Sequence, residues 1–451
     1  MSGGAGLQAR TIFAPATAPG RAGVGIVRLS GPEAGSTASL LTGRPLPPPR
    51  SAALRLFSDP RDGEPLDRGL LLWMPGPATV TGEDVVELHH HGGRAVRAGL
   101  LAALAAVPGL RPAEPGEFTR RAFLNGRLDL TAAEAVADLV DADTRLQARQ
   151  ALRQLDGAFG QRCAVWRECL AAALALAEAE IDFGAEEGDV GESLLAPRLA
   201  ELRGMAAGIA ALLEEAPRGA RLREGLCVAV VGAPNAGKSS LVNLLARREV
   251  AIVTEIAGTT RDVIEVELEL DGLPVTLLDT AGLRESADPI EREGVARARR
   301  RAAEADLRLL VVDAREDAAA ALEELGGDGE VLLVVNKRDL VPEGTPLPPG
   351  ALAISCLGAQ GIGRLEERLA GAARRLMGTG EGGGATRERH RLALAEAWGA
   401  LDRFLAGHGR IELALAAEEL RLAARALGRI TGAVGVEEVL DRIFAGFCIG
   451  K

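Results

Sequence analysis

One short segment of this chain fits only a few folds. Residues 232–239 read Gly-Ala-Pro-Asn-Ala-Gly-Lys-Ser and directly follow the apolar run 226–231. A helical pattern comes next, so the segment is the loop of a strand–loop–helix unit, whose backbone N–H groups and helix N-terminus can surround phosphate groups. We therefore predict a parallel sheet covered by helices, with a phosphate-binding loop after its first strand.

Three further segments follow in an order typical of guanine-nucleotide hydrolases. Residues 279–282 read Asp-Thr-Ala-Gly, as expected of the switch that contacts the γ-phosphate and Mg²⁺. Residues 336–339 read Asn-Lys-Arg-Asp, and the Asp carboxylate can accept hydrogen bonds from guanine N1–H and N2–H₂, which adenine does not offer. Residues 355–357 read Ser-Cys-Leu, where the loop flanking the base is expected. Together these segments predict a GTPase in which Lys238 contacts the β/γ-phosphates and Ser239 binds Mg²⁺.

The usual water-orienting glutamine is absent. Many GTPases place it after the glycine of the second switch, and this chain has Leu283 there. Another group must then position water and neutralise charge. Asn235 and the first-switch segment 254–262 offer oxygen ligands for a monovalent cation, which could take the place of an arginine finger. The candidate for orienting water is Glu291, with Arg261 and Arg284 as weaker alternatives.

Charge and lysine usage constrain the partners. The net charge of -11 argues against a broad basic surface for nucleic acid, and leaves local arginine clusters or a partner as the route to RNA. Only three of the 52 basic residues are lysine, namely Lys238, Lys337 and Lys451, and each stands in a segment with predicted chemistry. Lysine is a compact ammonium that fits a tight phosphate cradle, whereas arginine is a planar fork.

Cysteine spacing and hydropathy indicate the compartment. The five cysteines show no Cys-x-x-Cys spacing, so neither a zinc site nor a disulfide framework is predicted, and a reducing cytoplasm is expected. The sequence lacks a hydrophobic signal core, and no apolar run approaches the ~18 residues that a membrane span needs. We therefore expect a cytoplasmic protein without a membrane segment.

Changes in composition and hydrophobic pattern along the sequence predict a multidomain fold. Residues 1–118 have short strands and Gly/Pro-rich turns typical of an α+β domain, and residues 119–222 have the helical spacing of an all-α bundle. Residues 223–377 alternate strands and helices, as in an α/β Ras-like P-loop GTPase domain, and residues 378–451 are helical again after a Gly-rich linker. The simplest architecture inserts the GTPase domain into one helical domain.

Several blocks resemble the MnmE (TrmE) family of tRNA modification GTPases. The resemblance covers nearly the whole chain and rests on residues 11–14 and 19–28, on 81–88 and 91–93, on 115–130, on the four GTPase segments, and on the terminal Cys-Ile-Gly-Lys, residues 448–451. It implies an N-terminal domain that forms a homodimer and binds a folate one-carbon donor, a helical domain, and an inserted potassium-activated GTPase domain.

The same resemblance implies a reaction and its partners. GTP hydrolysis would drive addition of a carboxymethylaminomethyl or aminomethyl group to C5 of the wobble uridine of certain tRNAs, with glycine or ammonium as amine donor. The one-carbon donor would be 5,10-methylenetetrahydrofolate, with 5-formyltetrahydrofolate as its analogue. FAD would be supplied by the family's partner MnmG (GidA) in a heterotetramer.

The resemblance also assigns roles to individual positions. It implies K⁺ ligands at Asn235, Thr254, Ile256 and Thr259, Mg²⁺ ligands at Ser239 and Thr260, a catalytic carboxylate at Glu291, and folate contacts at Arg28, Glu87, Arg127 and Lys451. The predicted GTP contacts are Asn235, Ala236, Gly237, Lys238, Ser239, Ser240, Thr254, Glu255, Ile256, Ala257, Gly258, Thr259, Thr260, Asp279, Thr280, Ala281, Gly282, Asn336, Lys337, Asp339, Ser355, Cys356 and Leu357. Arg127, Val80 and Cys356 depart from the family's more usual Lys, Tyr and Ala.

Some positions allow two interpretations. Cys448 is either a catalytic thiolate acting on the pyrimidine or the folate adduct, or a small apolar residue that seats the tail. Residues 89–91 are three histidines, for which a structural role is favoured over a metal site because neighbouring strand residues point to opposite faces. The arginines at 297 and 299–301 form a solvated face or a contact to RNA, a partner or a second copy.

There are two alternatives to a tRNA modification GTPase as the function of the chain. They are a GTP-dependent ribosome-assembly factor and a folate enzyme with a vestigial GTPase.

Overall fold

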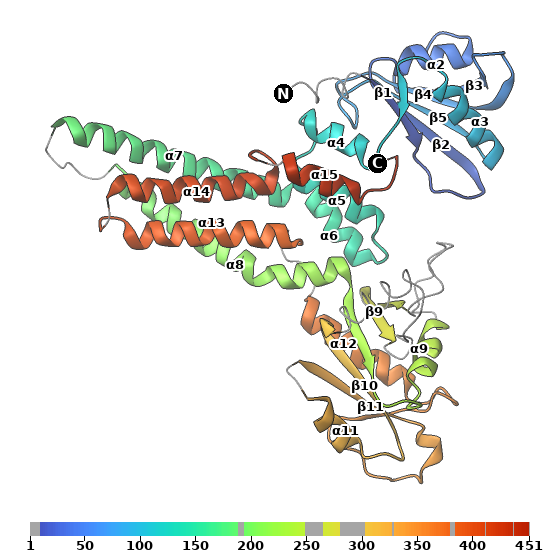
Figure 1. Cartoon of the computed structure of the whole chain (residues 1–451), viewed down its shortest axis with the longest axis vertical. Coiled ribbons are helices and arrows are strands. Elements are labelled where there is room, and N and C mark those ends of the chain that lie inside the picture. Colours follow the sequence, from blue (N-terminus) through green and yellow to red (C-terminus); the bar gives the residue numbers. More distant parts are fainter. Residues whose placement is uncertain are drawn as a thin grey trace, which may run out of the picture. The chain divides into compact units, whose positions relative to one another are not determined.

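The computed structural model describes residues 10–187, 194–248, 265–279, 303–326, 329–378, 384–410, 412–435 and 437–450 (Figure 1). Internal contacts divide the chain into two compact units, which are described separately. One comprises residues 1–137, 154–195 and 408–451, and the other residues 138–153 and 196–407. This division cuts the helical segments differently from the predicted domain boundaries, which remain a proposal.

The first unit contains a six-stranded sheet in the order β3-β4-β5-β2-β1-β6. Its strands are β1 (Thr11–Pro15), β2 (Ala22–Ser30), β3 (Ala52–Ser58), β4 (Pro65–Met74), β5 (Val85–Gly92) and β6 (Leu110–Pro112). Neighbours are antiparallel except β1 and β6. Helices α2 (Ala34–Thr42) and α3 (Arg94–Ala105) pack with the sheet around Val27, Leu29 and Leu88. The alternate residues Arg28 and Glu87 are thereby left on the opposite face.

The helices of the same unit are rich in alanine and leucine. They are α4 (Glu117–Leu124), α5 (Leu130–Val140), α7 (Ala158–Glu187), α14 (Leu413–Thr431) and α15 (Glu437–Ala445). The long helices α7 and α14 lie side by side (Figure 1). Leu170, Ala173 and Ala177 on α7 are buried, as are Leu420 and Ala423 on α14. The stripe predicted at residues 170–181 as bundle core is therefore confirmed at these positions, and the small alanines allow the close approach.

Among the described residues of the second unit, the helices that do not cover its sheet are α6 (Arg145–Leu155), α8 (Leu199–Glu224) and α13 (Glu388–Gly407), with the short 3₁₀ turn η1 (Ala196–Arg198) before α8. Helix α13 packs on α8. The amides of Gln147 and Gln150 on α6 donate to the carbonyl oxygens of Arg223 and Gly219 on α8, at 3.1 Å each. Helix α8 then leads through Gly225 directly into the sheet.

The sheet of the second unit has the order β12-β11-β10-β7-β9-β8. Its strands are β7 (Leu226–Val231), β8 (Glu265–Leu270), β9 (Leu273–Asp279), β10 (Leu307–Asp313), β11 (Glu330–Asn336) and β12 (Leu352–Ala353), and its helices are α9 (Lys238–Ala246), α11 (Ala318–Leu325) and α12 (Ile362–Met377), with the 3₁₀ turn η3 (Arg338–Leu340). All neighbouring strands are parallel except β8 and β9. This is the α/β arrangement that the sequence predicts.

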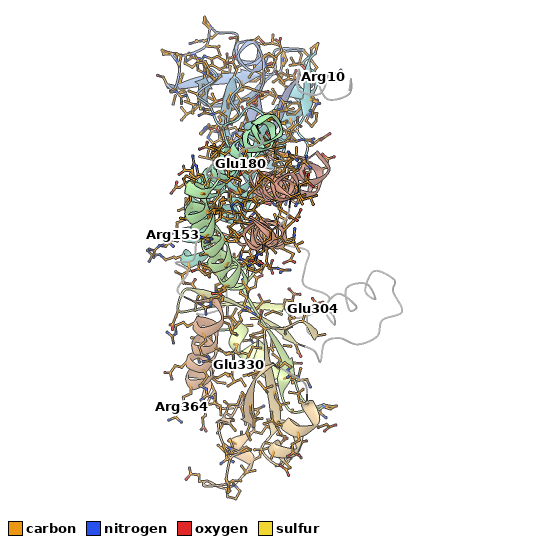
Figure 2. The ribbon with its side chains drawn as sticks, turned by 90° about the vertical axis from the view of Figure 1, so that its left-hand side faces the viewer. Arg10, Arg153, Glu180, Glu304, Glu330 and Arg364 are labelled. Atoms are coloured by element: carbon orange, nitrogen blue, oxygen red, sulfur yellow. The ribbon has the colours of Figure 1, made fainter. Side chains whose placement is uncertain are left out.

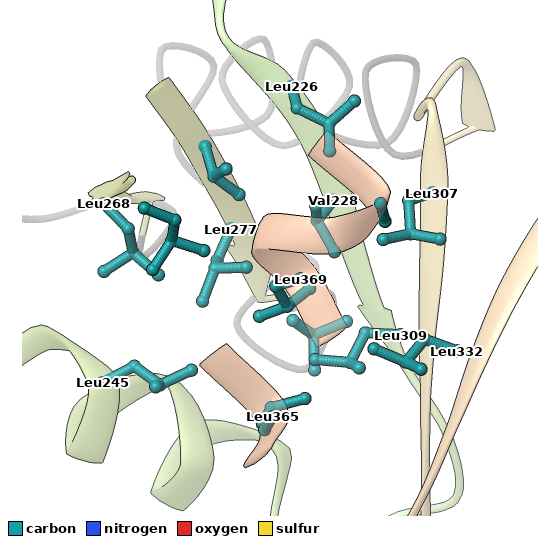
Figure 3. Close-up of a cluster of buried hydrophobic side chains, with 14 of the residues drawn as sticks. Leu226, Val228, Leu245, Leu268, Leu277, Leu307, Leu309, Leu332, Leu365 and Leu369 are labelled. Atoms are coloured by element: carbon teal, nitrogen blue, oxygen red, sulfur yellow. The ribbon is translucent and has the colours of Figure 1, made fainter. Parts of the chain in front are cut away.

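Helix α12 shows why this sheet is covered. Leu365 and Leu369 project into a core with Leu226, Val228 and other strand residues (Figure 3). Arg364, one position before Leu365, is exposed on the outer side of the helix (Figure 2). Apolar residues recurring every three to four positions thus hold the helix on the sheet, while its arginines stay in water.

The hairpin between β8 and β9 also follows the sequence. Asp271 and Gly272 both have positive φ values, 54° and 79°, which is the geometry of a tight type I′ connection. Val266, Leu268 and Leu270 on β8 are buried, as the alternation predicts. In the described parts of the chain, no helix combines the length and apolar character needed to cross a membrane.

Candidate nucleotide site and C-terminal tail

The loop between β7 and α9 has the shape of a phosphate cradle. Gly232 and Gly237 have φ values of 140° and 100°, and Asn235 has 65°. A Cβ atom on Gly232 would lie 2.1 Å from the carbonyl oxygen of Val311, and one on Gly237 would lie 2.2 Å from Nδ2 of Asn336. Only glycine fits these two positions without displacing its neighbours, so the backbone is free to wrap around a ligand.

Lys238 places its charge inside this loop. It is the first residue of α9, it is 7% exposed, and its Nζ donates to the carbonyl oxygens of Gly232 (2.8 Å) and Ala233 (2.9 Å). Ser239 follows it in the first turn and is half-buried. An ammonium group, a hydroxyl and the N–H groups of a helix N-terminus at one place suit a phosphate with its bound cation.

Asn336 connects three of the predicted segments. It ends β11, it is 1% exposed, and its Nδ2 donates to the carbonyl oxygen of Ala236 at 2.9 Å. Its Oδ1 accepts from the backbone N–H of Cys356 at 3.2 Å. The side chain therefore holds the phosphate loop and the loop after β12 together.

Lys337 binds both the phosphate loop and an acid that the sequence reasoning missed. Its Nζ donates to the carbonyl oxygen of Asn235 (2.7 Å) and to Oδ2 of Asp313 (2.8 Å). Hydrogen bonds from the Arg315 guanidinium, together with Lys337, hold the pKa of Asp313 far below its usual range, although burial opposes this. The sequence signal that could have identified Asp313 is an aspartate at the end of an apolar strand. In the structure, Asp313 lies beside Asn336 in the parallel register of β10 and β11.

Asp339 and Ser355 complete the base-reading side. The Ser355 hydroxyl, which is buried, donates to Oδ1 of Asp339 at 2.5 Å. Backbone hydrogen bonds to Gln360 at 3.0 and 3.1 Å fix the Ser355 loop. Burial raises the pKa of the neighbouring Cys356 thiol, so the thiol is neutral at physiological pH. Leu357, 90% exposed, offers a large apolar surface beside these polar groups.

A pocket of about 600 Å³ opens between these groups. It is lined by Gly237, Ser240, Asn243, Leu244, Arg247, Asn336, Lys337, Asp339, Leu340, Cys356 and Leu357. Concave sites of this size, with apolar walls and a few directed polar groups, are typical of small-ligand binding. The structure thus brings together the predicted residues of three segments around one cavity that continues into the phosphate loop.

Other predicted positions lie outside the described residues. These are Thr254, Glu255, Ile256, Ala257, Gly258, Thr259, Thr260, Arg261, Thr280, Ala281, Gly282, Leu283, Arg284, Glu291, the arginines at 297 and 299–301, and Lys451. Of the K⁺ and Mg²⁺ sets, Asn235 and Ser239 are described, and both lie at the phosphate loop. Asp279 ends β9 next to β7 and is 1% exposed.

Two of the predicted folate residues form one cluster in the first unit. The Arg28 guanidinium binds the Glu87 carboxylate at 2.9 and 3.0 Å and lies 5.9 Å from the ring centre of Phe118. Arg127 is exposed, and its backbone N–H donates to the carbonyl oxygen of Ala122 at 2.8 Å. A paired guanidinium and carboxylate beside an aromatic ring can hydrogen-bond a flat heterocycle, so these residues fit a pterin.

The C-terminal tail contacts Gly116 and Pro15 of the same unit. Phe444 and Phe447 are buried with their rings 5.3 Å apart, and the backbone N–H of Gly116 points to the carbonyl oxygen of Cys448 at 3.5 Å. Gly450 is buried with a φ of 101°, and a Cβ atom there would lie 2.0 Å from the carbonyl oxygen of Pro15. Cys448 itself is exposed, so its neighbours hold the tail.

Gly450 therefore docks on β1, the strand that pairs with the Arg28-bearing strand β2. Pro15 pairs with Val27 in the β1–β2 ladder, and Ala14 pairs with Arg28. The docking site of Gly450 is thus one residue along β1 from the partner of Arg28. These positions are distant in sequence, and the structure brings Gly450 to the adjacent strands β1 and β2.

A buried ionic network lies at the other end of β1, beside Arg10 and Ser30, and was not anticipated. Arg121 is 3% exposed and donates to Glu83 (2.9 Å), to Glu117 (3.0 Å) and to the carbonyl oxygen of Arg10 (2.9 Å). Burial would raise the pKa of Glu117, but hydrogen bonds from Arg111, the Glu114 N–H and Arg121 lower it below its usual value. The network joins the 81–88 and 115–130 blocks, which the sequence showed only as separate motifs.

The three histidines at 89–91 bind to separate groups. His89 Nε2 lies 3.2 Å from the Glu87 carboxylate, His91 Nδ1 lies 2.8 Å from Asp67, and the His90 ring is buried against Gly25. Within the described ranges, no group of three or more His, Cys, Asp or Glu side chains is arranged to hold a metal ion. This arrangement supports the structural interpretation of the three rings.

Comparisons with known proteins agree over nearly the whole chain. Residues 11–127 match the family described as "GTP-binding protein TrmE N-terminus", and residues 130–448 match the "MnmE helical domain". A curated relative named tRNA modification GTPase MnmE, from Methylobacterium sp. (strain 4-46), is 56% identical over 98% of this chain and 99% of its own length. Another of the same name, from Paramagnetospirillum magneticum, is 54% identical over 98% and 100%.

A solved structure covers a smaller part. Era in complex with MgGDPNP and nucleotides 1506-1542 of 16S ribosomal RNA is 27% identical over 32% of this chain and 56% of that chain, with a TM-score of 0.25.

Proposed function

The chain belongs to the MnmE family of tRNA modification GTPases, and from that premise we propose that it hydrolyses GTP in the modification of tRNA. The target would be C5 of the wobble uridine of certain tRNAs, which receives a carboxymethylaminomethyl or aminomethyl group. One observation carries the nucleotide part of the proposal: Asn336 binds both the phosphate loop and the base-reading loop around a single pocket.

Each nucleotide-binding side chain has a role that follows from its chemistry. Lys238 and the N–H groups at the start of α9 neutralise the phosphates, and Asp339, oriented by Ser355, reads the guanine edge. Ser239 and Thr260 would hold Mg²⁺, which neutralises charge on the β/γ-phosphates. Asn235, Thr254, Ile256 and Thr259 would hold K⁺, which supplies positive charge where an arginine finger otherwise acts. Glu291 would orient the attacking water.

The potassium role has a direct test. The rate of GTP hydrolysis would be measured in K⁺ and in Na⁺ at equal ionic strength, with the purified full chain. We expect a much higher rate in K⁺, because membership of the MnmE family implies a potassium-activated GTPase domain. Equal rates would refute the potassium role and leave GTP binding untouched.

The tail and the N-terminal sheet form the proposed one-carbon site. Arg28, Glu87, Arg127 and Lys451 would contact 5,10-methylenetetrahydrofolate, with Arg28 and Glu87 already paired in the structure. Cys448, whose thiol is exposed within the docked tail, would act as a nucleophile there. Cys448→Ser is then expected to abolish tRNA modification and spare GTP hydrolysis; retained modification would exclude the nucleophile role.

Assembly belongs to the same proposal. A homodimer would act with an FAD-containing partner, MnmG, in a heterotetramer in the cytoplasm. The first experiment is nucleoside mass spectrometry of tRNA from cells that lack this chain. We expect loss of 5-aminomethyl-type wobble uridines and their return with the intact gene. An unchanged profile would reject the modification role and favour a ribosome-assembly GTPase.

A further inference from the structure

The pocket has a second wall that the four sequence segments do not account for. Ser240, Asn243, Leu244 and Arg247 line it from helix α9 and its C-terminal cap. Their spacing of three, four and seven positions places them on one face of the helix. Lys337, Asp339, Cys356 and Leu357 line the same pocket from the two loops. A ligand in this pocket therefore meets side chains of α9 as well as those of the loops.

Arg247 differs from its neighbour Arg248 in what it contacts. Arg248 binds the Glu366 carboxylate, with contacts of 2.5 Å from Nε and 3.2 Å from Nη2. Arg247 is exposed and lines the pocket, and the described part of the chain gives its guanidinium no carboxylate partner. Two consecutive arginines thus have separate environments, one satisfied within the protein and one open to a ligand.

The position of Arg247 indicates which part of a nucleotide it meets. It lies nine residues after Lys238, about 14 Å along the helix from the phosphate loop. That distance exceeds the reach of a phosphate contact and corresponds to the nucleoside end. Moreover, residues 248–264 contain no aromatic side chain that could cover a base.

We propose that the Arg247 guanidinium stacks on the guanine face turned toward α9, as a further residue determining nucleotide affinity. Guanidinium is planar and weakly hydrated, so it stacks on aromatic surfaces at a lower desolvation cost than an ammonium. The inference rests on the proposed GTP binding and adds a contact to it. Asp339 reads the base edge, whereas Arg247 covers the ring and is insensitive to the exocyclic amino group.

The test compares Arg247→Ala with Arg248→Ala in the full chain. Dissociation constants for GDP and for inosine diphosphate, which lacks the N2 amino group, would be measured by calorimetry. Arg247→Ala is expected to weaken GDP binding about 5- to 20-fold, and inosine diphosphate by the same factor, since stacking does not involve the amino group. Arg248→Ala is expected to stay within about twofold of the parent chain, because neither Arg248 nor its partner Glu366 lines the pocket.

Three outcomes would overturn the proposal. One is unchanged binding in Arg247→Ala, and another is an equal loss in both variants, which would indicate general damage to α9. The third is full rescue by Arg247→Lys, because a point charge would then be sufficient and stacking would be wrong. Failure of the parent chain to bind GDP would instead refute the proposed function itself, so the two failures are distinguishable.

Discussion

The side-chain amide of Asn336 donates a 2.9 Å hydrogen bond to the carbonyl oxygen of Ala236, a residue 100 positions earlier in the chain. The bond fixes the distance between the phosphate loop and the base-reading loop. It is buried, so no water competes for it. The two halves of the pocket therefore hold their spacing before any ligand arrives.

Gly237→Ala is expected to break this connection. The new methyl group would lie 2.2 Å from Asn336 Nδ2, at a φ of 100° that side chains rarely adopt. Backbone strain and the lost hydrogen bond together amount to about 3 kcal/mol, or about a 100-fold weaker GDP affinity by calorimetry.

The matched control is Gly363→Ala, in the same unit. Gly363 lies in α12 with open space around its missing Cβ and an ordinary helical φ. This substitution is expected to leave GDP binding unchanged and to stabilise the helix by about 0.5–1 kcal/mol. A loss of binding in both variants would mean that the domain tolerates no glycine replacement, and the Asn336 explanation would fail.

Asp313→Asn is expected to loosen Lys337. The aspartate carboxylate accepts charged hydrogen bonds from Lys337 and Arg315, and its low pKa keeps it ionised across the physiological range. Removing the charge frees the Lys337 ammonium from one of its two partners. GDP dissociation, followed by stopped flow with a fluorescent analogue, should accelerate about tenfold.

Asp317→Asn is the control for this prediction. Asp317 caps α11 by accepting from the N–H groups of Ala319 and Ala320, four residues after Asp313 and without contact to Lys337. Asparagine caps helices nearly as well, so both folding and GDP dissociation should be unaffected. If Asp313→Asn released GDP no faster than Asp317→Asn, Asp313 would have no positioning role.

The contrast between Asp271-Gly272 and Asp313 shows what a sequence can predict. The hairpin turn depends on two adjacent residues and on alternation in β8, so local pattern was sufficient. The Asp313–Lys337 pair depends on β10 and β11 being parallel neighbours in a register that places Asp313 beside Asn336. Strand order is a property of the folded sheet, and no local pattern reports it.

The same limit applies to the first unit. Arg121 lies in a recognisable motif, but its partners are Glu83, 38 positions earlier, and the Arg10 carbonyl, 111 positions earlier. The terminal motif was identified from its residues alone. That Gly450 packs on Pro15, near the other end of the chain, required the structure.

Glu117→Gln tests the buried network through pH. Because Arg111 and Arg121 lower the folded pKa of Glu117 below its usual value of 4.5, the ionised carboxylate stabilises the fold above about pH 4.5. That contribution is lost as the pH falls through the lowered folded pKa. The substitution should therefore destabilise the unit by about 3 kcal/mol at pH 7, and the difference from the parent should shrink below about pH 4.5.

The measurement is urea unfolding followed through Trp73, which packs on the sheet core, with Trp166 and Trp398 replaced by Phe. Glu114→Gln, at an exposed position three residues away, is the control and should change stability by less than about 0.5 kcal/mol. A difference between parent and Glu117→Gln that stayed constant from about pH 7 to about pH 3.5 would contradict the ionic explanation.

Gly450→Ala tests whether tail docking matters. A methyl group there would meet the Pro15 carbonyl oxygen at 2.0 Å, with a φ of 101°, so the tail must leave its seat. We expect carboxypeptidase to release Lys451 several-fold faster from this variant, because an undocked tail frays. Modified wobble uridine in complemented cells should fall at least tenfold, while GTP hydrolysis stays within twofold.

Gly446→Ala is the control, since its Cβ would come no closer than 3.7 Å to the Ile443 carbonyl oxygen. If Gly450→Ala matched Gly446→Ala in both carboxypeptidase release and modification, the contact with Pro15 would have no role in placing Cys448 and Lys451.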